Sequence, residues 1–417
     1  MHPHNEGTEL MTDFLWGAST SPHQVEGNNL NSDWWAQEQA FPQMFQPSGD
    51  ALDSYHRYAE DMKLLADAGL NAYRFGIEWA RIEPVEGHVS RAELAHYRRM
   101  IDTCLQLGLT PIVTIHHFSV PAWFKEAGGW LAPGAIDRFR AYVTACTDIL
   151  HDVPYIVTIN EPNVLALMSL MDQVMVSMRE GTFDAEAAAA GRSEGLAKVV
   201  PHPEIGDRLI EAHRAAREIL HASLSGKVGW TVAGQAFQST PGNEERYTEI
   251  KYAWEDKFLE AARGDDFIGV QAYTSQLIDG TGIVPHPEDP GNTLTGWAYR
   301  PDALGIAVRN AAEVTRGVPA LITENGIATT DDERRISYTS AALSHLAEAM
   351  ADGIDVLGYC HWSALDNYEW GDWEATFGLI AVDRSTFERH PKPSLAWLGD
   401  VARQGTPTQE SLPATHA

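Results

Sequence analysis

Long apolar runs are missing from this sequence. No stretch of its 417 residues approaches the roughly 18–20 consecutive apolar residues that a membrane-spanning helix needs, so we expect no membrane partner. The opening residues, MHPHNEGTELMTDF, lack the basic segment and the apolar run of a signal peptide. We therefore expect a cytoplasmic protein.

Cysteine is scarce, and the usual cofactor motifs are absent. Cys104, Cys146 and Cys360 lie far apart in apolar surroundings, which is typical of buried thiols in a reducing compartment. The sequence has no HExxH motif, no Cys–His cluster and no glycine-rich phosphate loop. We expect no disulfide, no metal ion and no organic cofactor.

Positive charge is also in short supply. Thirty lysines and arginines stand against 58 aspartates and glutamates, which gives a formal net charge of -28. Such a field repels polyanions at long range and makes nucleic acid a poor partner. Solubility alone can account for this charge. If the charge also bears on function, it indicates a ligand that is not strongly anionic.

Short apolar or β-branched runs alternate with segments of helical periodicity, the pattern of βα units around a parallel sheet. The runs lie at 14–18, 72–79, 110–117, 155–160, 228–233, 267–273, 320–324 and 356–362. The helical patterns lie at 53–70, 91–109, 134–150, 207–224 and 337–353. Eight runs favour an α/β fold built as one closed (β/α)8 TIM barrel with elaborated βα loops. No linker divides the chain, so we predict a catalytic domain at 1–404 and a disordered tail at 405–417.

The segment 164–202 is long and irregular, and we interpret it as an elaborated loop after the fourth strand. Its methionines follow helical spacing, at Met168, Met171, Met175 and Met178. A packed helix face is the favoured interpretation, ahead of a stripe that lines a substrate site.

Polar residues gather where the predicted strands end, at Glu78-Trp79, His116-His117, Asn160-Glu161, Tyr273 and Glu324-Asn325. In barrels of this class the active site lies at the C-terminal ends of the strands. The chain also has 13 tryptophans, several of them beside polar residues near these ends, and such flat rings suit the apolar face of a sugar. We therefore expect the functional site at this end of the barrel.

Two glutamates close their strands in similar surroundings. The fourth run ends in ThrIleAsnGluPro (158–162) and the seventh in ThrGluAsnGly (323–326). Cleavage of a glycosidic bond needs two carboxyl groups, one protonated and one ionised. Strands four and seven lie on different sides of an eight-stranded barrel, so Glu161 and Glu324 can face each other across its mouth. Either glutamate alone could cap a helix or join an ion pair, but two in the same context favour catalysis.

Further motifs occur in strand order, FLWGASTS…QVEG at 14–27, YRFGIEW at 73–79, HHF at 116–118 and WSALDNYEW at 362–370. Together they make the chain resemble family 1 of the glycoside hydrolases from Phe14 to about Pro393. The resemblance implies a retaining β-glycosidase with Glu161 as acid/base and Glu324 as nucleophile. The residues expected to support them are Asn160, Arg74 and Tyr273. The expected substrate contacts are Gln24, His117, Phe118, Trp362, Glu369, Trp370 and Phe377.

Charge decides the roles of the two glutamates. Carboxylates about 5 Å apart repel by about 3 kcal/mol at a dielectric constant of about 20, which is roughly two pKa units. Arg74 and the Tyr273 hydroxyl beside Glu324 would favour its ionised form and leave Glu161 protonated. Once Glu324 carries a glycosyl group, Glu161 can ionise and act as a base toward water. Asn160 would hydrogen-bond the sugar 2-hydroxyl.

The loop 366–377 limits which terminal sugar we expect the site to accept. This loop lacks the lysine that the phosphoglycosidase branch of the family presents to phosphate, and a Glu369 carboxylate would repel phosphate. We therefore expect a small-molecule β-glycoside with an unphosphorylated terminal sugar, glucose first, with side activity on galactosides and fucosides left open.

The chain departs from the family pattern in three places. Phe118 stands where the family usually has tryptophan, Gln271 stands where it commonly has asparagine, and a methionine-rich segment replaces the usual loop after the fourth strand. That loop borders the leaving group in relatives, so the resemblance does not predict the leaving group.

Two alternative functions were considered, and the first would use the same residues. A transglycosidase would pass the sugar to an acceptor alcohol instead of water. A non-hydrolytic sugar-binding protein would be marked by loss of a catalytic carboxylate, and both carboxylates are present. The oligomeric state is left open.

Overall fold

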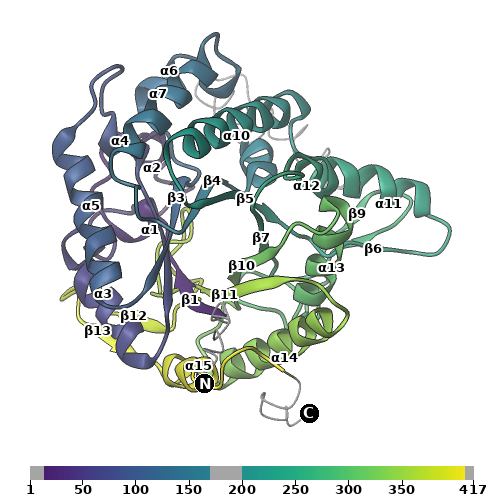
Figure 1. Ribbon diagram of the computed structural model, residues 1–417. Coiled ribbons are helices and arrows are strands. Elements are labelled where there is room, and N and C mark those ends of the chain that lie inside the picture. Colours follow the sequence, from purple (N-terminus) through teal and green to yellow (C-terminus); the bar gives the residue numbers. More distant parts are fainter. Residues whose placement is uncertain (1–13, 170–199, 409–417) are drawn as a thin grey trace, which may run out of the picture.

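The computed structural model describes residues 14–169 and 200–408, in which eight parallel strands close into a barrel (Figure 1). The order around the barrel is β1-β11-β10-β7-β5-β4-β3-β2. The strands are β1 (Leu15–Ser19), β2 (Ala72–Gly76), β3 (Thr110–His116), β4 (Tyr155–Asn160), β5 (Lys227–Ala233), β7 (Phe267–Gln271), β10 (Ala320–Asn325) and β11 (Val356–Trp362). The predicted (β/α)8 barrel is confirmed, and each predicted run contributes one strand.

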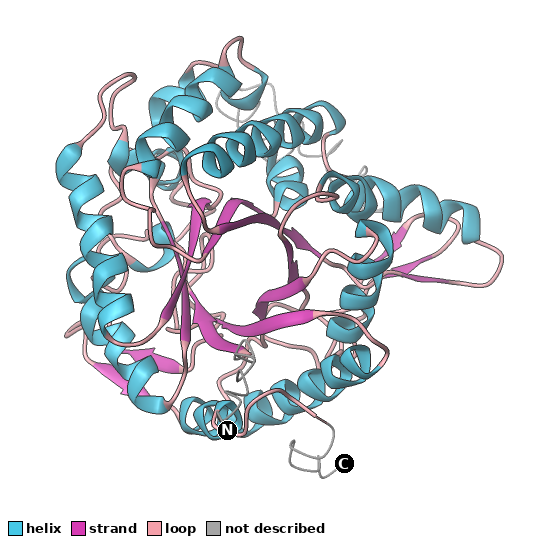
Figure 2. Cartoon of the chain, viewed as in Figure 1, coloured by secondary structure: helices cyan, strands magenta, loops and turns pink. Residues whose placement is uncertain are grey.

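Helices surround the barrel and cover its outer face (Figure 2). They are α3 (Ser54–Ala68), α5 (Arg91–Gln106), α7 (Ala135–Thr147), α10 (Pro203–Ser223), α12 (Lys257–Ala261), α13 (Ala303–Thr315), α14 (Asp332–Ala351) and α15 (Pro393–Ala402). The apolar spacing of α3 illustrates why they pack there. Its Met62 and Leu65 are buried on one face, and the helix ends at Gly69, whose φ of 104° lies in the left-handed region that glycine favours.

The loops between strands carry shorter elements. The short helices are α1 (Pro22–Val25), α2 (Asp33–Ala40), α4 (Trp79–Ile82), α6 (Ala122–Glu126), η1 (Gly129–Leu131), α11 (Glu244–Lys251) and η3 (Tyr252–Asp256). The short strands are β6 (Gln238–Ser239), β8 (Leu277–Ile278), β9 (Ile283–Val284), β12 (Ile380–Val382) and β13 (Arg389–Pro391). Figure 1 shows α11, β6 and β9 projecting to one side of the barrel.

The interior of the barrel is filled by side chains from the strands themselves. One buried cluster consists only of strand residues, Leu15, Ala72, Ile112, Val157, Phe267, Leu321 and Cys360. A larger apolar cluster includes buried residues of both the strands and the surrounding helices. Alternate residues of each strand therefore point inward and outward, as the pleat requires. All three cysteines are free and buried, so the prediction of buried thiols is confirmed.

Two predicted boundaries differ from the structure, and both lie where an acidic residue caps a helix. The second run was predicted to reach residue 79, but β2 ends at Gly76, and the Glu78 carboxylate accepts a hydrogen bond from the Ala80 N–H at the start of α4. Helix α14 begins near Asp332, five residues earlier than predicted, because Asp331 caps its first backbone N–H groups. The polar first turn of that helix hid its apolar periodicity.

Several predictions fall at the edges of the described ranges. Residues 162–169 are helical, and Met168 packs against the aromatic cluster of Trp34 and Phe45, whereas Met171, Met175 and Met178 lie outside the described residues. Residues 409–417 also lie outside them, so the disordered tail stays a prediction, although the Gly405 carbonyl accepts a hydrogen bond from the Trp16 indole (2.9 Å). No helix in the two described ranges is long and apolar enough to cross a membrane.

Candidate active site

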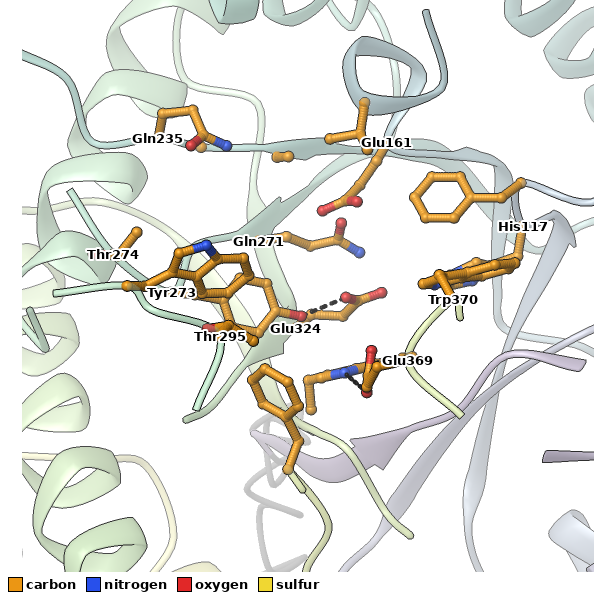
Figure 3. Close-up of a pocket in the computed structure, with 17 residues that line it drawn as sticks. His117, Glu161, Gln235, Gln271, Tyr273, Thr274, Thr295, Glu324, Glu369 and Trp370 are labelled. Atoms are coloured by element: carbon orange, nitrogen blue, oxygen red, sulfur yellow. Dashed lines mark hydrogen bonds between the residues drawn. The ribbon is translucent and has the colours of Figure 1, made fainter. Parts of the chain in front are cut away.

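A pocket of about 340 Å³ opens at the C-terminal ends of the barrel strands. Figure 3 shows Glu161, which directly follows β4, converging on it with side chains from β7, β10 and the loop after β11. The predicted site residues that line it are His117, Phe118, Glu161, Tyr273, Glu324, Trp362, Glu369, Trp370 and Phe377. The fold therefore brings together residues that are up to 260 positions apart in the sequence, from 117 to 377.

Glu324 lies near the end of β10 and is held by two hydrogen-bond donors. The Arg74 guanidinium, from β2, donates to Oε1, and the Tyr273 hydroxyl donates to Oε2 over 2.6 Å (Figure 3). Burial raises the pKa of the Glu324 carboxyl, and both donors act against that rise because they stabilise the charged form. Glu324 is the carboxyl of the pair whose surroundings favour ionisation.

Glu161 follows β4 and differs in its surroundings. Its backbone N–H donates to the carbonyl (3.0 Å) and to the hydroxyl (3.2 Å) of Thr231 on β5, which fixes the start of the side chain. Burial and the neighbouring Glu324 charge raise the pKa of the Glu161 carboxyl well above its usual range. No side-chain donor within the described residues opposes this rise by a hydrogen bond, so Glu161 is the protonated member of the pair.

Asn160 links several residues of the pocket floor. Its Oδ1 accepts three hydrogen bonds, from Arg74, from the Thr231 hydroxyl (3.1 Å) and from the Gln271 amide (2.9 Å). Its Nδ2 donates to Nε2 of His117 over 3.2 Å. Burial and the nearby Arg74 charge lower the pKa of His117 well below its usual range, so this imidazole is neutral and can accept that bond.

Glu369 occupies the opposite wall, where two donors meet its oxygens. The Trp362 indole donates to Oε1 (3.1 Å), and the Gln24 amide donates to Oε2 (3.1 Å). Burial raises the pKa of Glu369 to about 8 despite both bonds. Burial therefore disfavours the charge of this carboxylate, and the expected repulsion of phosphate by Glu369 stays a prediction.

The pocket lining is poor in positive charge. Among the described residues, those that line the pocket include no lysine and no arginine that could pair with a phosphoryl group. Nor does the described part of the chain hold any group of three or more His, Cys, Asp or Glu residues arranged to bind a metal ion.

Aromatic rings form much of the remaining wall. Trp370 stacks on His117, with ring centroids 6.1 Å apart and planes inclined by 16°, and it meets Phe118 edge-on. Across the pocket, Phe377 meets Tyr273 edge-on at 5.8 Å. These rings give a sugar two apolar surfaces between which the polar groups are placed.

Not every predicted residue reaches the cavity. Gln24 is fully buried behind Glu369, and its amide also donates to Asn367 (3.0 Å) and to the Tyr368 carbonyl (2.8 Å), so the structure does not bring it to the pocket surface. Arg74 and Asn160 are likewise buried beneath the pocket lining, where they hydrogen-bond to the lining residues Glu324 and Gln271.

Four residues of the predicted strand-end pairs lie away from the pocket, Glu78, Trp79, His116 and Asn325. Glu78 accepts a hydrogen bond from Ser119 (2.7 Å) in addition to capping α4, and His116 packs among Trp79, Trp130 and Phe139. The expectation that they belong to the site was wrong, because their side chains are engaged elsewhere. The Trp79 indole donates to Glu83 (2.9 Å), and the Asn325 amide donates to the Ala272 carbonyl (2.7 Å).

Seven lining residues were not singled out from the sequence as site residues. Val164 lies in the helix after β4 and Ala233 ends β5, whereas the other five lie in loops: Gly234, Gln235, Thr274, Thr295 and Trp297. Thr295 and Trp297 belong to the long connection between β9 and α13, which has no periodicity to predict its course. Trp297 packs against Tyr273 with ring centroids 5.7 Å apart. An aromatic residue in a glycine-rich loop is the single sequence signal that could have identified it.

Comparison with known proteins agrees with this geometry. The family model described as glycosyl hydrolase family 1 matches residues 7–178 and 245–406. The chain is 30% identical to a thermostable β-glucosidase B of Thermobispora bispora, with 94% of this chain and 90% of that protein covered. It is 27% identical to β-glucosidase A of Thermotoga maritima, with 94% and 97% covered.

Solved structures resemble it along nearly the whole chain. The crystal structure of the β-glycosidase BGL167 superposes with a TM-score of 0.83 at 42% identity and covers 97% of this chain and 98% of that chain. The family 1 β-glucosidase from Thermotoga maritima superposes with a TM-score of 0.81 at 26% identity, with 94% and 98% covered.

Proposed function

We propose that this chain, which belongs to glycosyl hydrolase family 1 and is a glycoside hydrolase of the β-glucosidase type, works by retention of configuration. In this proposal it releases a terminal, unphosphorylated β-linked sugar, glucose first, from a disaccharide or from an aryl or alkyl glycoside. The catalytic residues would be Glu161 and Glu324. Side activity on galactosides and fucosides belongs to the same proposal.

The observation that carries the proposal is the unequal environment of the two glutamates. Glu324 accepts hydrogen bonds from Arg74 and Tyr273, whereas Glu161 has no comparable donor among the described residues and faces the Glu324 charge. A retaining glycosidase needs this division, because one carboxylate attacks the sugar while the other group delivers a proton. Both side chains line one pocket, as Figure 3 shows.

The reaction would follow from these two states. The Glu324 carboxylate attacks the anomeric carbon while Glu161 protonates the departing oxygen, which breaks the glycosidic bond and forms a glycosyl ester. Glu161 has then given its proton to the leaving group, and because the ester removes the Glu324 charge that had raised the pKa of Glu161, it remains a carboxylate. It then takes a proton from water, whose oxygen attacks the anomeric carbon and frees Glu324.

The choice of sugar rests on the opposite wall. Glu369 can donate as well as accept a hydrogen bond when it is protonated, which suits neutral hydroxyl groups. Trp362 and Trp370 supply flat surfaces beside it. With no lysine or arginine among the described lining residues, a phosphorylated sugar has no counter-charge in this pocket.

A substrate panel tests the proposal. Nitrophenyl β-glucoside, galactoside, fucoside and 6-phosphoglucoside would be compared by kcat/KM, with the anomer first released identified by NMR. We expect the neutral glucoside to turn over far faster than its 6-phosphate and to give the β-anomer first. Comparable values for these two substrates would reject the neutral sugar, and release of the α-anomer would reject retention. Adding an acceptor alcohol measures transfer against hydrolysis in the same assay.

A further inference from the structure

Gln271 is a pocket residue that the proposed chemical steps leave unused. It ends β7, lies in register with Glu324 on β10, and lines the pocket although its side chain is fully buried. Figure 3 shows its amide group between the carboxyl groups of Glu161 and Glu324. A polar group in this position is close to any atom that the two glutamates act on.

The two ends of this amide are unequally satisfied. Nε2 donates to Oδ1 of Asn160 over 2.9 Å, so the orientation of the amide is set by that bond. Oε1 is buried and has no hydrogen-bond partner among the described residues. A buried carbonyl oxygen without a donor is unfavourable, and at a pocket wall it marks a place for a donor on the ligand.

The chemistry of a glycoside restricts which donor this can be. The ring oxygen and the glycosidic oxygen carry no hydrogen, so neither can donate to Oε1. Glu324 is placed to attack the anomeric carbon, and the sugar hydroxyl nearest that carbon is the 2-hydroxyl. The position of Gln271 beside Glu324 therefore selects the 2-hydroxyl among the hydroxyl groups of the sugar.

Asn160 cannot take the hydrogen of that hydroxyl. Its Oδ1 already accepts bonds from Arg74, Thr231 and Gln271, which exhausts a carbonyl oxygen, so Asn160 has only its Nδ2 group to offer. A hydroxyl that receives a bond from Nδ2 still needs an acceptor for its own hydrogen.

We propose that Gln271 is a further substrate-binding residue whose Oε1 accepts a hydrogen bond from the 2-hydroxyl of the sugar. This inference rests on the proposed glycosidase function and adds one contact to it. The 2-hydroxyl becomes more acidic as positive charge develops on the anomeric carbon, so the bond strengthens in the transition state and acts on kcat more than on KM.

The test pairs a change in the protein with a change in the substrate. Gln271→Met keeps the length of the side chain and removes both the carbonyl oxygen and the NH2 group of the amide. Its kcat/KM would be measured on nitrophenyl β-glucoside and on the 2-deoxy analogue, and the ratio of the two compared with that of the unaltered enzyme. We expect the ratio of kcat/KM on the glucoside to kcat/KM on the 2-deoxy analogue to fall at least about tenfold. The variant loses the bond to the 2-hydroxyl of the glucoside, whereas the analogue never makes that bond.

Thr231→Val is the matched control. It removes another donor to Oδ1 of Asn160 without touching the free oxygen of Gln271. If Gln271 acted only by holding Asn160 in place, Thr231→Val would lower the ratio as well. We expect the ratio to stay unchanged in Thr231→Val, and a matching fall in both variants would overturn the proposal.

Gln271→Glu covers the case in which Gln271→Met does not fold. It retains an acceptor oxygen and loses the donor to Asn160, so the preference for the 2-hydroxyl should persist even if the overall rate falls. Loss of that preference in Gln271→Glu, or an unchanged ratio in folded Gln271→Met, would overturn the contact. An unaltered enzyme that hydrolyses no β-glycoside would instead reject the proposed function itself.

Discussion

The inner wall of the pocket and its outer rim are held in different ways. The inner wall comprises Gln271, Tyr273 and Glu324, and Arg74 and Asn160 support it from beneath. All five lie within barrel strands or within two residues of a strand end, and hydrogen bonds join them to one another. Strand ends are fixed by the barrel ladder, so their side chains have little freedom. This rigidity suits groups that must keep their geometry during catalysis.

The outer rim comprises Gln235, Thr295 and Trp297, which come from loops. The Thr295 hydroxyl bonds to Thr293 of its own loop (2.8 Å), and the Trp297 backbone N–H bonds to the same residue (3.2 Å). Trp297 contacts the inner wall by packing its ring against Tyr273, with ring centroids 5.7 Å apart. In the proposed function, this difference assigns the chemical steps to the inner wall. The rim could then vary, and with it the preference for a leaving group, without moving the catalytic residues.

The largest effect is expected from the inner wall. Glu324→Gly removes the nucleophile and should lower kcat on nitrophenyl β-glucoside by roughly 10⁴-fold or more. Added azide or formate should restore turnover and give a product of the opposite anomeric configuration, which NMR would detect. A variant that kept most of its activity without these anions would show that Glu324 is not the nucleophile and that the inner wall does not carry the chemistry.

Glu161→Ala should follow, with an effect that depends on the leaving group. Disaccharides need protonation of the departing oxygen and should lose about 10²- to 10⁴-fold, whereas a dinitrophenyl glucoside should lose far less. Because Glu161 must be protonated, activity of the unaltered enzyme falls as pH rises through its raised pKa. A pH profile of kcat/KM in the variant should lack this alkaline limb, and an unchanged limb would exclude Glu161 as the acid.

Tyr273→Phe is a smaller change within the same wall. It removes the 2.6 Å hydrogen bond to Glu324, which stabilises the charged carboxylate, so the pKa of Glu324 should rise. Activity is lost as pH falls through that pKa, and the acid limb of kcat/KM should therefore move to higher pH by about one unit. An acid limb that stayed in place would show that Arg74 alone holds Glu324 ionised.

The smallest effect is expected from the rim. Trp297→Ala should raise KM for aryl glycosides by about tenfold or less and leave kcat nearly unchanged, since it removes contact that substrate and transition state share. The measurement is a series of aryl and alkyl glucosides with one sugar. A loss of kcat as large as that of Glu161→Ala would show that the rim is part of the catalytic wall.

The same division explains what could be predicted from the sequence. The eight strands and the glutamates Glu161 and Glu324 were predictable, because strand periodicity and short motifs at strand ends are local signals. Glu78 and His116 satisfied the same rule and yet lie outside the pocket, because a local pattern does not say which way the chain turns after a strand.

Backbone conformation was the other hidden element. Phe118, Glu161 and Trp370 all line the pocket with positive φ angles, of 64°, 43° and 50°, although none is a glycine. Left-handed backbone at such residues is held by the surrounding structure and is common at functional sites. Neither these angles nor the rim residues of the loops can be predicted from composition or periodicity.

The closure of the barrel also bears on how the chain folds. β1 pairs with β2, but it also pairs with β11, so that Leu15 lies opposite Gly358 and Ser19 opposite Trp362. This seam joins segments more than 300 residues apart, and contacts of such long sequence separation form late because the intervening chain must first be ordered. During synthesis, the edge of β1 that pairs with β11 therefore stays unpaired until β11 has been made. That exposed edge makes the growing chain prone to aggregation before the pocket exists.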